Sequence, residues 1–261
     1  MLNYTEYGDT AADRPTLIIV HGLYGSGRNW GVIAKRLSDN RRVVTVDMRN
    51  HGSSPHHASH SYPDMAQDIA EVIEHLGGLV DICGHSMGGK AVMLLALTHP
   101  ELLRRVIVAD IAPVTYGHTQ QMFIDAMRSV DLAHIERRSD AEAQLAKAGV
   151  ERALQSFFTQ SLDVPGKRWR LNLDALEAEM PKIIGWPEGV GGQFDGPTLF
   201  LSGGASDYVR AEHRGPIKEL FPQARFAKLP DAGHWLHAEK PREFEATLRI
   251  FLNTERADTP S

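Results

Sequence analysis

The sequence predicts an α/β fold: a mostly parallel central sheet flanked by helices, with a helical lid inserted into it. Three observations support this class. Short apolar runs rich in Val and Ile alternate with helical patterns along most of the chain. These runs lack polar alternation, which is typical of parallel strands that are covered on both faces. The alternation stops over residues 113–186, where consecutive helical patterns rich in Ala, Gln, Glu, Arg and Met follow one another.

The expected strands are apolar runs, and in chain order they span 17–20, 43–46, 79–83, 106–109, 198–201 and 226–229. The expected helices repeat apolar residues at helical spacing, and they span 63–76, 87–99, 120–130, 140–148, 151–160, 173–184 and 241–252. Since strands lie on both sides of the helical block, we expect one core, residues 1–112 and 187–261, with a helical lid at 113–186. The polar tail, 253–261, lacks periodicity and is expected to fray.

Composition narrows the function classes. Hydrophobic residues make up 42% and charged residues 23% of the 261 positions, which is ordinary for a globular chain. Lys and Arg number 28 against 33 Asp and Glu, so the net charge of −5 argues against nucleic acid as the main partner. No run approaches the roughly 20 apolar residues of a membrane span. The absence of a visible secretory signal and the lone cysteine, Cys83, favour a reducing, cytoplasmic compartment.

The strongest chemical signal is the run 84–89, GHSMGG, directly after an expected strand and directly before an apolar helix. It contains G-x-S-x-G in the strand–turn–helix context that a nucleophile elbow requires. Glycines are needed because side chains in so tight a turn would collide with neighbouring strands. We therefore expect Ser86 to present its hydroxyl above the sheet as a nucleophile, with the helix N-terminus behind it favouring negative charge.

Two further loops lie at the carboxyl ends of strands. The first, 21–25 (HGLYG), can point a backbone N–H into the site, and we expect the amides of Leu23 and Met87 to form an oxyanion hole. His21 is interpreted as a structural residue of that loop, with a proton-transfer role as the alternative. The second, 230–235 (PDAGHW), places His234 to take the Ser86 proton. His237 is the competing candidate and ranks below His234.

Four motifs in this order, HGLYGS, DMRNHGSS, GHSMGGK and DAGHW, resemble the α/β-hydrolase superfamily over nearly the whole chain. VADIAP, NLDAL and GPTLFLSGG narrow the resemblance to the esterase branch of the bacterial YbfF-type and the mitochondrial ABHD11-like proteins. The resemblance implies an α/β-hydrolase fold and a Ser–His–acid triad.

The triad acid has two main candidates. Most of the superfamily carries it after the strand that follows the lid, which implies Asp207, whereas the esterase branch implies Asp110 in VADIAP. We favour Asp110, whose strand neighbours the nucleophile's strand if sequential strands are adjacent. Asp207 stays open, and Asp174 is a minor candidate that more plausibly caps a lid helix.

Aromatic residues are expected to line the substrate pocket, namely Tyr24, Phe157, Trp186, Tyr208 and Trp235. Phe158 and Trp169 are further candidates, although lid-to-core packing accounts for such residues equally well. Cys83 is expected to be a small core residue.

No cofactor is expected, because the phosphate-binding glycine motifs are absent. No metal is expected either, since the histidines that could suggest a site lie in a Ser/Pro-rich loop without carboxylates; they are His51, His56, His57 and His60. In the same loop Arg49 and Asn50 are interpreted as structural, with a binding role as the alternative.

These residues predict a serine hydrolase that cleaves small carboxylic esters or thioesters through an acyl-enzyme. The alternatives are other chemistry of the same fold, such as carbon–carbon bond hydrolysis or a cofactor-free lyase. A non-catalytic binding protein would predict a broken triad or elbow, and neither is seen. A haloalkane dehalogenase is disfavoured because Ser86 replaces the carboxylate nucleophile.

Overall fold

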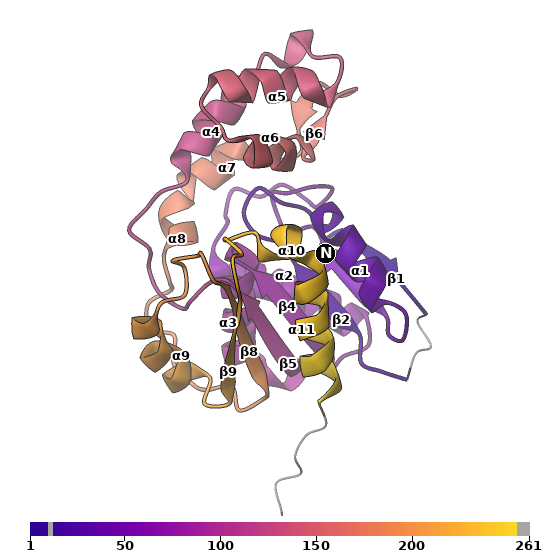
Figure 1. The fold of residues 1–261 in the computed structure, drawn as a ribbon, viewed down its shortest axis with the longest axis vertical. Coiled ribbons are helices and arrows are strands. Elements are labelled where there is room, and N and C mark those ends of the chain that lie inside the picture. Colours follow the sequence, from indigo (N-terminus) through magenta and orange to yellow (C-terminus); the bar gives the residue numbers. More distant parts are fainter. Residues whose placement is uncertain (10–12, 255–261) are drawn as a thin grey trace, which may run out of the picture.

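A seven-stranded sheet forms the centre of the molecule, in the order β1-β3-β2-β4-β5-β8-β9 (Figure 1). The structure is a computed structural model that describes residues 1–9 and 13–254. The strands are β1 (Tyr4–Tyr7), β2 (Leu17–Val20), β3 (Val43–Val46), β4 (Val80–His85), β5 (Leu103–Ala109), β8 (Thr198–Gly203) and β9 (Ala224–Leu229). Every pairing is parallel except that of β1 with β3. The predicted α/β class with a mostly parallel sheet is confirmed.

Helices cover both faces of the sheet (Figure 1). One face packs against α1 (Gly31–Leu37) and α11 (Pro241–Asn253), and the other packs against α2 (Tyr62–His75) and α3 (Met87–Thr98). In β2, Leu17 and Ile19 face the first pair, while Ile18 and Val20 face the second. Because all four residues of β2 and of β3 are buried, these strands are continuous apolar runs in the sequence.

Between β5 and β8 the chain forms a body that lies above the carboxyl ends of the strands (Figure 1). We call it the α4–α8 segment. Its elements are α4 (Gln121–Arg128), α5 (Arg138–Lys147), α6 (Arg152–Thr159), β6 (Leu162–Asp163), β7 (Arg168–Trp169), α7 (Leu173–Ala178) and α8 (Met180–Ile184). The remaining short helices are α9 (Arg214–Leu220), α10 (Leu236–Glu239), η1 (Gly27–Trp30), η2 (Pro100–Leu102), η3 (Leu132–His134) and η4 (Ala211–His213).

The structure differs from the sequence-based expectation in several places, and α1 and α9, for example, match no expected helix. The β6–β7 hairpin interrupts what was expected to be a wholly helical segment, and its turn includes Lys167 at a φ of 52°. The helix expected at 173–184 is two helices, because Pro181, the second residue of α8, has no N–H to continue the first helix. β1 escaped prediction since the middle residues of this edge strand, Thr5 and Glu6, are exposed.

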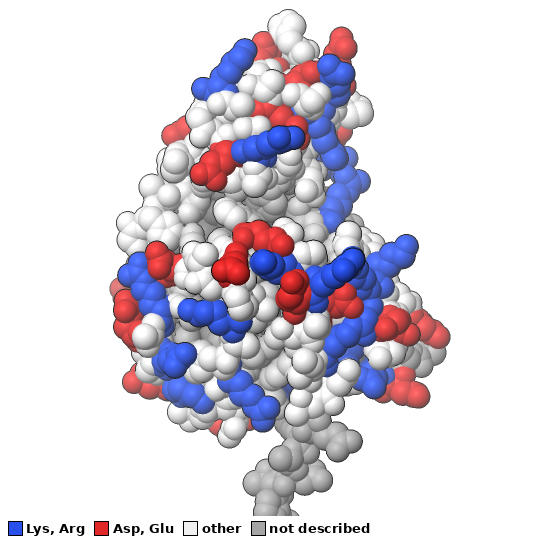
Figure 2. All heavy atoms as spheres, in the orientation of Figure 1, with Lys and Arg blue, Asp and Glu red and all other residues white. Residues whose placement is uncertain are grey.

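At the C-terminus α11 runs to Asn253, and residues 255–261 of the predicted polar tail lie outside the described residues. In the described part of the chain, no helix is both long and apolar enough to cross a membrane. On the face shown in Figure 2, basic and acidic side chains are interspersed over the core and the α4–α8 segment alike. That face therefore presents no continuous basic surface.

Candidate active site

Ser86 occupies the sharp turn between β4 and α3, with φ 52° and ψ −121°. A positive φ is strained for a residue other than glycine. The turn is held by the Ser86 N–H, which donates to the Ala109 carbonyl at 3.0 Å. The flanking glycines are needed for space: a Cβ at Gly84 would lie 2.4 Å from the Gly88 carbonyl oxygen, and one at Gly88 would lie 2.5 Å from the His21 carbonyl oxygen. The glycines thus allow β2, β4 and α3 to meet beneath the serine.

Three side chains form one line of hydrogen bonds at this turn. The Ser86 Oγ lies 3.0 Å from His234 Nε2, and His234 Nδ1 lies 2.8 Å from Asp110 Oδ2. With Nδ1 protonated and donating to the carboxylate, Nε2 is left as an acceptor for the serine hydroxyl. Ser86 follows β4, Asp110 follows β5, and His234 lies in the loop after β9. β4 and β5 are parallel neighbours, as expected.

Asp110, not Asp207, is the carboxylate that contacts His234. Asp110 is fully buried at the end of β5. Its Oδ1 accepts from the Gly203 N–H at 2.9 Å, and its Oδ2 also accepts from the Ser206 hydroxyl at 2.5 Å. Asp207 is exposed, and within the described residues its one hydrogen bond is made by its carbonyl, which accepts from Arg210 Nε.

The third acid candidate, Asp174, lies on the surface and pairs with Arg128. Its predicted capping role is wrong, because the side chain that caps α7 is that of Asn172, which accepts from the Ala175 N–H.

The two residues whose amides are expected to form the oxyanion hole lie beside the nucleophile. Leu23 and Met87 both line the pocket around Ser86. Within the described residues, neither amide donates to another group of the protein. The next amide along, that of Tyr24, is instead occupied, because it donates to His51 Nε2 at 3.1 Å. An oxyanion hole at these two amides therefore stays a prediction.

Buried neutral histidines support this loop. His21 accepts from the Met48 N–H through Nε2 and donates to the Gly22 carbonyl through Nδ1. His51 likewise donates to the Arg49 carbonyl, and burial holds the pKa of both rings below the usual value. These bonds use both nitrogens of His21 and His51 on protein groups, as the structural interpretation of His21 requires.

The other polar residues of the loop after β3 are either hydrogen-bonded to protein groups or exposed. Arg49 makes a bidentate pair with Asp68, and the side-chain Oδ1 of Asn50 accepts from the His57 N–H. His60 is buried, whereas the side chains of His56 and His57 are exposed. Across the described residues, no cluster of three or more His, Cys, Asp or Glu side chains could hold a metal ion.

Sequence reasoning missed His85, which lies directly before Ser86. Its Nε2 donates to the His234 carbonyl at 2.8 Å, so it holds the backbone of the loop that carries His234. Burial lowers the pKa of His85 to about 3, and the ring is therefore neutral. The competitor of His234, His237, stacks on Trp30 with ring centroids 4.0 Å apart, and no bond joins it to Ser86 among the described residues. The only sequence signal for His85 was its place beside the nucleophile.

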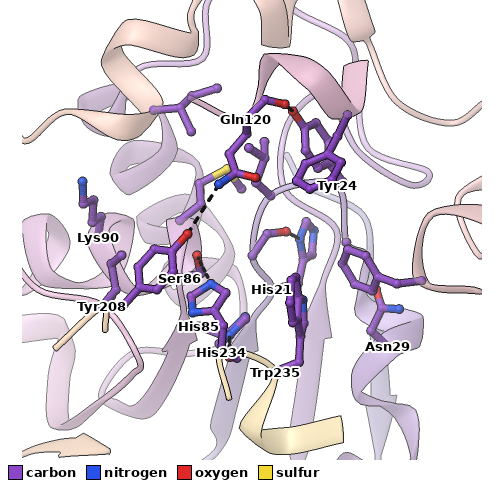
Figure 3. A pocket seen from close by; sticks show the side chains of 18 of the residues that line it. His21, Tyr24, Asn29, His85, Ser86, Lys90, Gln120, Tyr208, His234 and Trp235 are labelled. Atoms are coloured by element: carbon purple, nitrogen blue, oxygen red, sulfur yellow. Dashed lines mark hydrogen bonds between the residues drawn. The ribbon is translucent and has the colours of Figure 1, made fainter. Parts of the chain in front are cut away.

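A pocket of about 250 Å³ opens above Ser86 (Figure 3). Of the five expected lining residues, Tyr24, Phe157, Tyr208 and Trp235 line it. Trp186 does not; its backbone N–H bonds to Thr115 beyond the end of α8. Of the further candidates, Phe158 lines the pocket, whereas the Trp169 indole is buried and donates to the Met127 carbonyl.

Part of the apolar wall of the pocket comes from the α4–α8 segment. It includes residues that the sequence did not single out, namely Phe123, Leu154, Ile183 and Ile184. Lys90 also lines the pocket, one helical turn beyond Ser86. Its ammonium donates to the carbonyls of Ile184 and Gly185, and burial lowers its pKa to about 7. Cys83 is fully buried, as expected, and burial raises the pKa of its thiol to about 12.

Comparisons with known proteins point in one direction. The sequence profile of a family described as alpha/beta hydrolase fold matches residues 15–241. The mouse protein named sn-1-specific diacylglycerol lipase ABHD11 is 42% identical over 256 residues, which cover 94% of this chain and 83% of that protein. The Escherichia coli K12 protein named esterase YbfF is 37% identical over 241 residues, 91% of this chain and 92% of its own. A solved structure described as a marine microorganism esterase aligns with a TM-score of 0.90 at 37% identity, covering 96% of this chain and 98% of that one.

Proposed function

Because this chain belongs to the α/β-hydrolase family, we propose that it is a serine hydrolase that cleaves small carboxylic esters or thioesters through an acyl-enzyme. The resemblance to the YbfF-type and ABHD11-like branch that the motifs predicted is confirmed, and the chain is an α/β hydrolase with esterase and lipase relatives. The observation that carries the finer proposal is the hydrogen-bonded line from Ser86 through His234 to Asp110 at the floor of the pocket.

In the proposed first step, Ser86 Oγ attacks the carbonyl carbon of the ester while its proton moves to His234 Nε2. The carbonyl π electrons move to oxygen, which the amides of Leu23 and Met87 stabilise. Collapse of this intermediate breaks the bond to the leaving group, which takes the proton from Nε2 and departs as an alcohol or thiol. In the second step water attacks the acyl-enzyme in the same way, and the acid is released.

Asp110 has a defined part in both steps. Its carboxylate orients the imidazole and stabilises the imidazolium that forms when Nε2 takes the proton. The Gly203 amide and the Ser206 hydroxyl fix the carboxylate in turn, so that Oδ2 points at Nδ1. Burial strengthens this interaction, since water does not compete for the carboxylate.

The α4–α8 segment is proposed to act as the lid of the pocket, within the predicted limits 113–186. Phe123, Leu154 and Phe157 from this segment line the same pocket as Ser86 and suit an acyl chain. The modest volume, about 250 Å³, favours short to medium chains over long ones.

The test is a panel of p-nitrophenyl esters and acyl thioesters of increasing chain length, with a diacylglycerol as a further substrate. We expect kcat/KM to peak at short to medium chains and Ser86→Ala to abolish turnover of every substrate that the wild type cleaves. Turnover that survives in Ser86→Ala would contradict the proposal. Strong activation on lipid emulsions would contradict the lid assignment, because it implies a large mobile lipase lid.

A further inference from the structure

The ring of Tyr208 lies flat against the imidazole of His234. The two ring centroids are 3.9 Å apart and the planes are inclined by 19°. The other rings near His234 do not stack: Trp235 meets it edge-on at 5.4 Å, and His85 is tilted at 4.9 Å. Tyr208 is thus the one aromatic side chain among the described residues that presents its π face to this imidazole.

Tyr208 is held at both its hydroxyl and its backbone. The hydroxyl accepts from Gln120 Nε2 at 3.4 Å and lies 2.9 Å from His118 Nε2. The Tyr208 carbonyl accepts from the Tyr116 hydroxyl at 2.7 Å, and its N–H donates to Ser206 Oγ at 3.3 Å. Four partners for one tyrosine fix the ring in its place over His234.

One of these partners links Tyr208 to the opposite side of the pocket. The carbonyl of Gln120 accepts from the Tyr24 hydroxyl at 2.9 Å, while its side chain reaches Tyr208. Figure 3 shows Gln120 between Tyr24 and Tyr208, above Ser86. We call this chain of contacts the Tyr24–Gln120–Tyr208 bridge. It connects the loop that carries the Leu23 amide with the ring on His234.

We propose that Tyr208 is a positioning residue whose ring face stabilises the protonated form of His234 during acyl transfer, with the backbone bonds of Tyr208 to Tyr116 and Ser206 holding the residue over the imidazole. The inference rests on the proposed function, in which Nε2 takes the Ser86 proton and then passes it to the leaving group. The face of an aromatic ring is electron-rich and attracts a cation. A neutral imidazole gains less from that face than an imidazolium does. The stack therefore strengthens as positive charge develops, and such an interaction accelerates the chemical step.

Other titratable groups also face His234, and their roles differ from that of Tyr208. Asp110 after β5 supplies the negative partner at Nδ1. His85 from β4 and His237 from α10 are buried rings whose charged forms would repel an imidazolium, and burial keeps both neutral. His118 reaches only the Tyr208 hydroxyl. Tyr208 is thus the neutral group whose contact favours the charged form.

The test compares Tyr208→Leu, which removes the π face, with Tyr208→Phe, which keeps the face and loses only the hydroxyl. The readout is the pH profile of kcat/KM with a neutral p-nitrophenyl ester. We expect Tyr208→Leu to move the midpoint of the acidic limb to lower pH by roughly 0.4 to 1.5 units and to reduce the plateau about 2- to 30-fold. Tyr208→Phe should keep the wild-type midpoint. A merely structural tyrosine would change the plateau and leave the midpoint where it was.

A substrate-free measurement separates this inference from the proposed function. The titration of His234, followed by NMR in histidine-labelled protein with Asp110 intact, should show the same shift in Tyr208→Leu and none in Tyr208→Phe. An unchanged midpoint in Tyr208→Leu, or an equal shift in both variants, would overturn the inference. If the wild type cleaves no ester, the proposed function fails, while the NMR comparison still decides the effect of Tyr208 on His234.

Discussion

Replacing Asp110 by Asn tests the electrostatic core of the proposed mechanism. The native Oδ1 accepts from the Gly203 N–H and Oδ2 accepts from His234 Nδ1 and the Ser206 hydroxyl. An asparagine has one acceptor and one donor at these two places. If its NH₂ group faces His234, Nδ1 must become the acceptor, so the proton moves to Nε2 and Ser86 loses its base. If the NH₂ group is flipped, it opposes the Gly203 N–H instead, in a fully buried position.

Either orientation of the asparagine amide should reduce turnover severely. Loss of the correct tautomer in a Ser–His–Asp site reduces turnover by roughly three to four orders of magnitude, which corresponds to about 4 to 5.5 kcal/mol in the barrier. The assay is kcat on a short-chain p-nitrophenyl ester, with circular dichroism to show that the variant is folded. The matched control is Asp207→Asn. Asp207 lies one residue beyond Ser206 and is exposed, so this variant should retain near-normal turnover.

The refuting result is specific. If Asp207→Asn is crippled and Asp110→Asn is near normal, the acid has been misassigned, whatever the static contacts. Equal, moderate losses would mean that the two carboxylates can substitute for one another at His234.

Three further predictions concern the scaffold. Gly88→Ala should abolish activity or folding, because the new Cβ would lie 2.5 Å from the His21 carbonyl oxygen. The control is Gly117→Ala, whose Cβ would meet nothing within 4 Å and which should leave soluble yield and kcat unchanged. A functional Gly88→Ala enzyme would contradict the packing argument. Burial lowers the pKa of Lys90 to about 7 from 10.5, so between these pH values the unfolded chain binds more protons than the folded one. The stability of the wild type relative to Lys90→Met should therefore rise from pH 7 to pH 10. A difference in Tm that does not change with pH would refute this. Burial also lowers the pKa of His60 and His85 to about 3 from 6.5, so as pH drops below 6.5 these histidines take up protons in the unfolded chain before they do in the folded one. The free energy of unfolding should therefore fall below pH 6.5. Urea titrations that give the same free energy of unfolding at pH 7 and pH 4.5 would show that these rings are not buried and neutral.

The parts of the fold that could be predicted are those with a strong local signal. β2 and β3 are apolar runs that are buried on both faces, and the structure has them at the expected residues. The turn at Ser86 could be predicted because a Cβ at its glycines would collide with backbone atoms of the adjoining elements. Only glycine fits at such positions, and the sequence shows it as the G-x-S-x-G pattern. β1 and the β6–β7 hairpin have no such signal, since one is a half-exposed edge strand and the other has two residues in each strand.

The choice between Asp110 and Asp207 could not be made from local pattern alone. Both follow strands that end at the same edge of the sheet, and β5 and β8 are parallel neighbours. What separates them is burial and the direction of the side chain. Asp110 is enclosed and receives hydrogen bonds from Gly203 and Ser206, whereas Asp207 lies in solvent.

The pocket shows the same limit of sequence reasoning. Trp186 was an attractive aromatic candidate, yet it follows α8 and stays outside the lining, whereas Ile183 and Ile184 on the preceding turn line the pocket. Phe123 lies on α4 and Leu154 on α6, and only the packing of the α4–α8 segment brings both to the pocket. Such side-chain directions depend on tertiary contacts rather than on local periodicity.

The most direct test of the central claim is covalent labelling of Ser86. A fluorophosphonate probe reacts with a serine whose hydroxyl is activated by a neighbouring base. Mass spectrometry of the digested wild type should place a single adduct on the peptide that contains Ser86, and Ser86→Ala should remain unlabelled while retaining the wild-type circular dichroism spectrum. An adduct at another serine in the alanine variant, or no adduct on the folded wild type, would contradict the account.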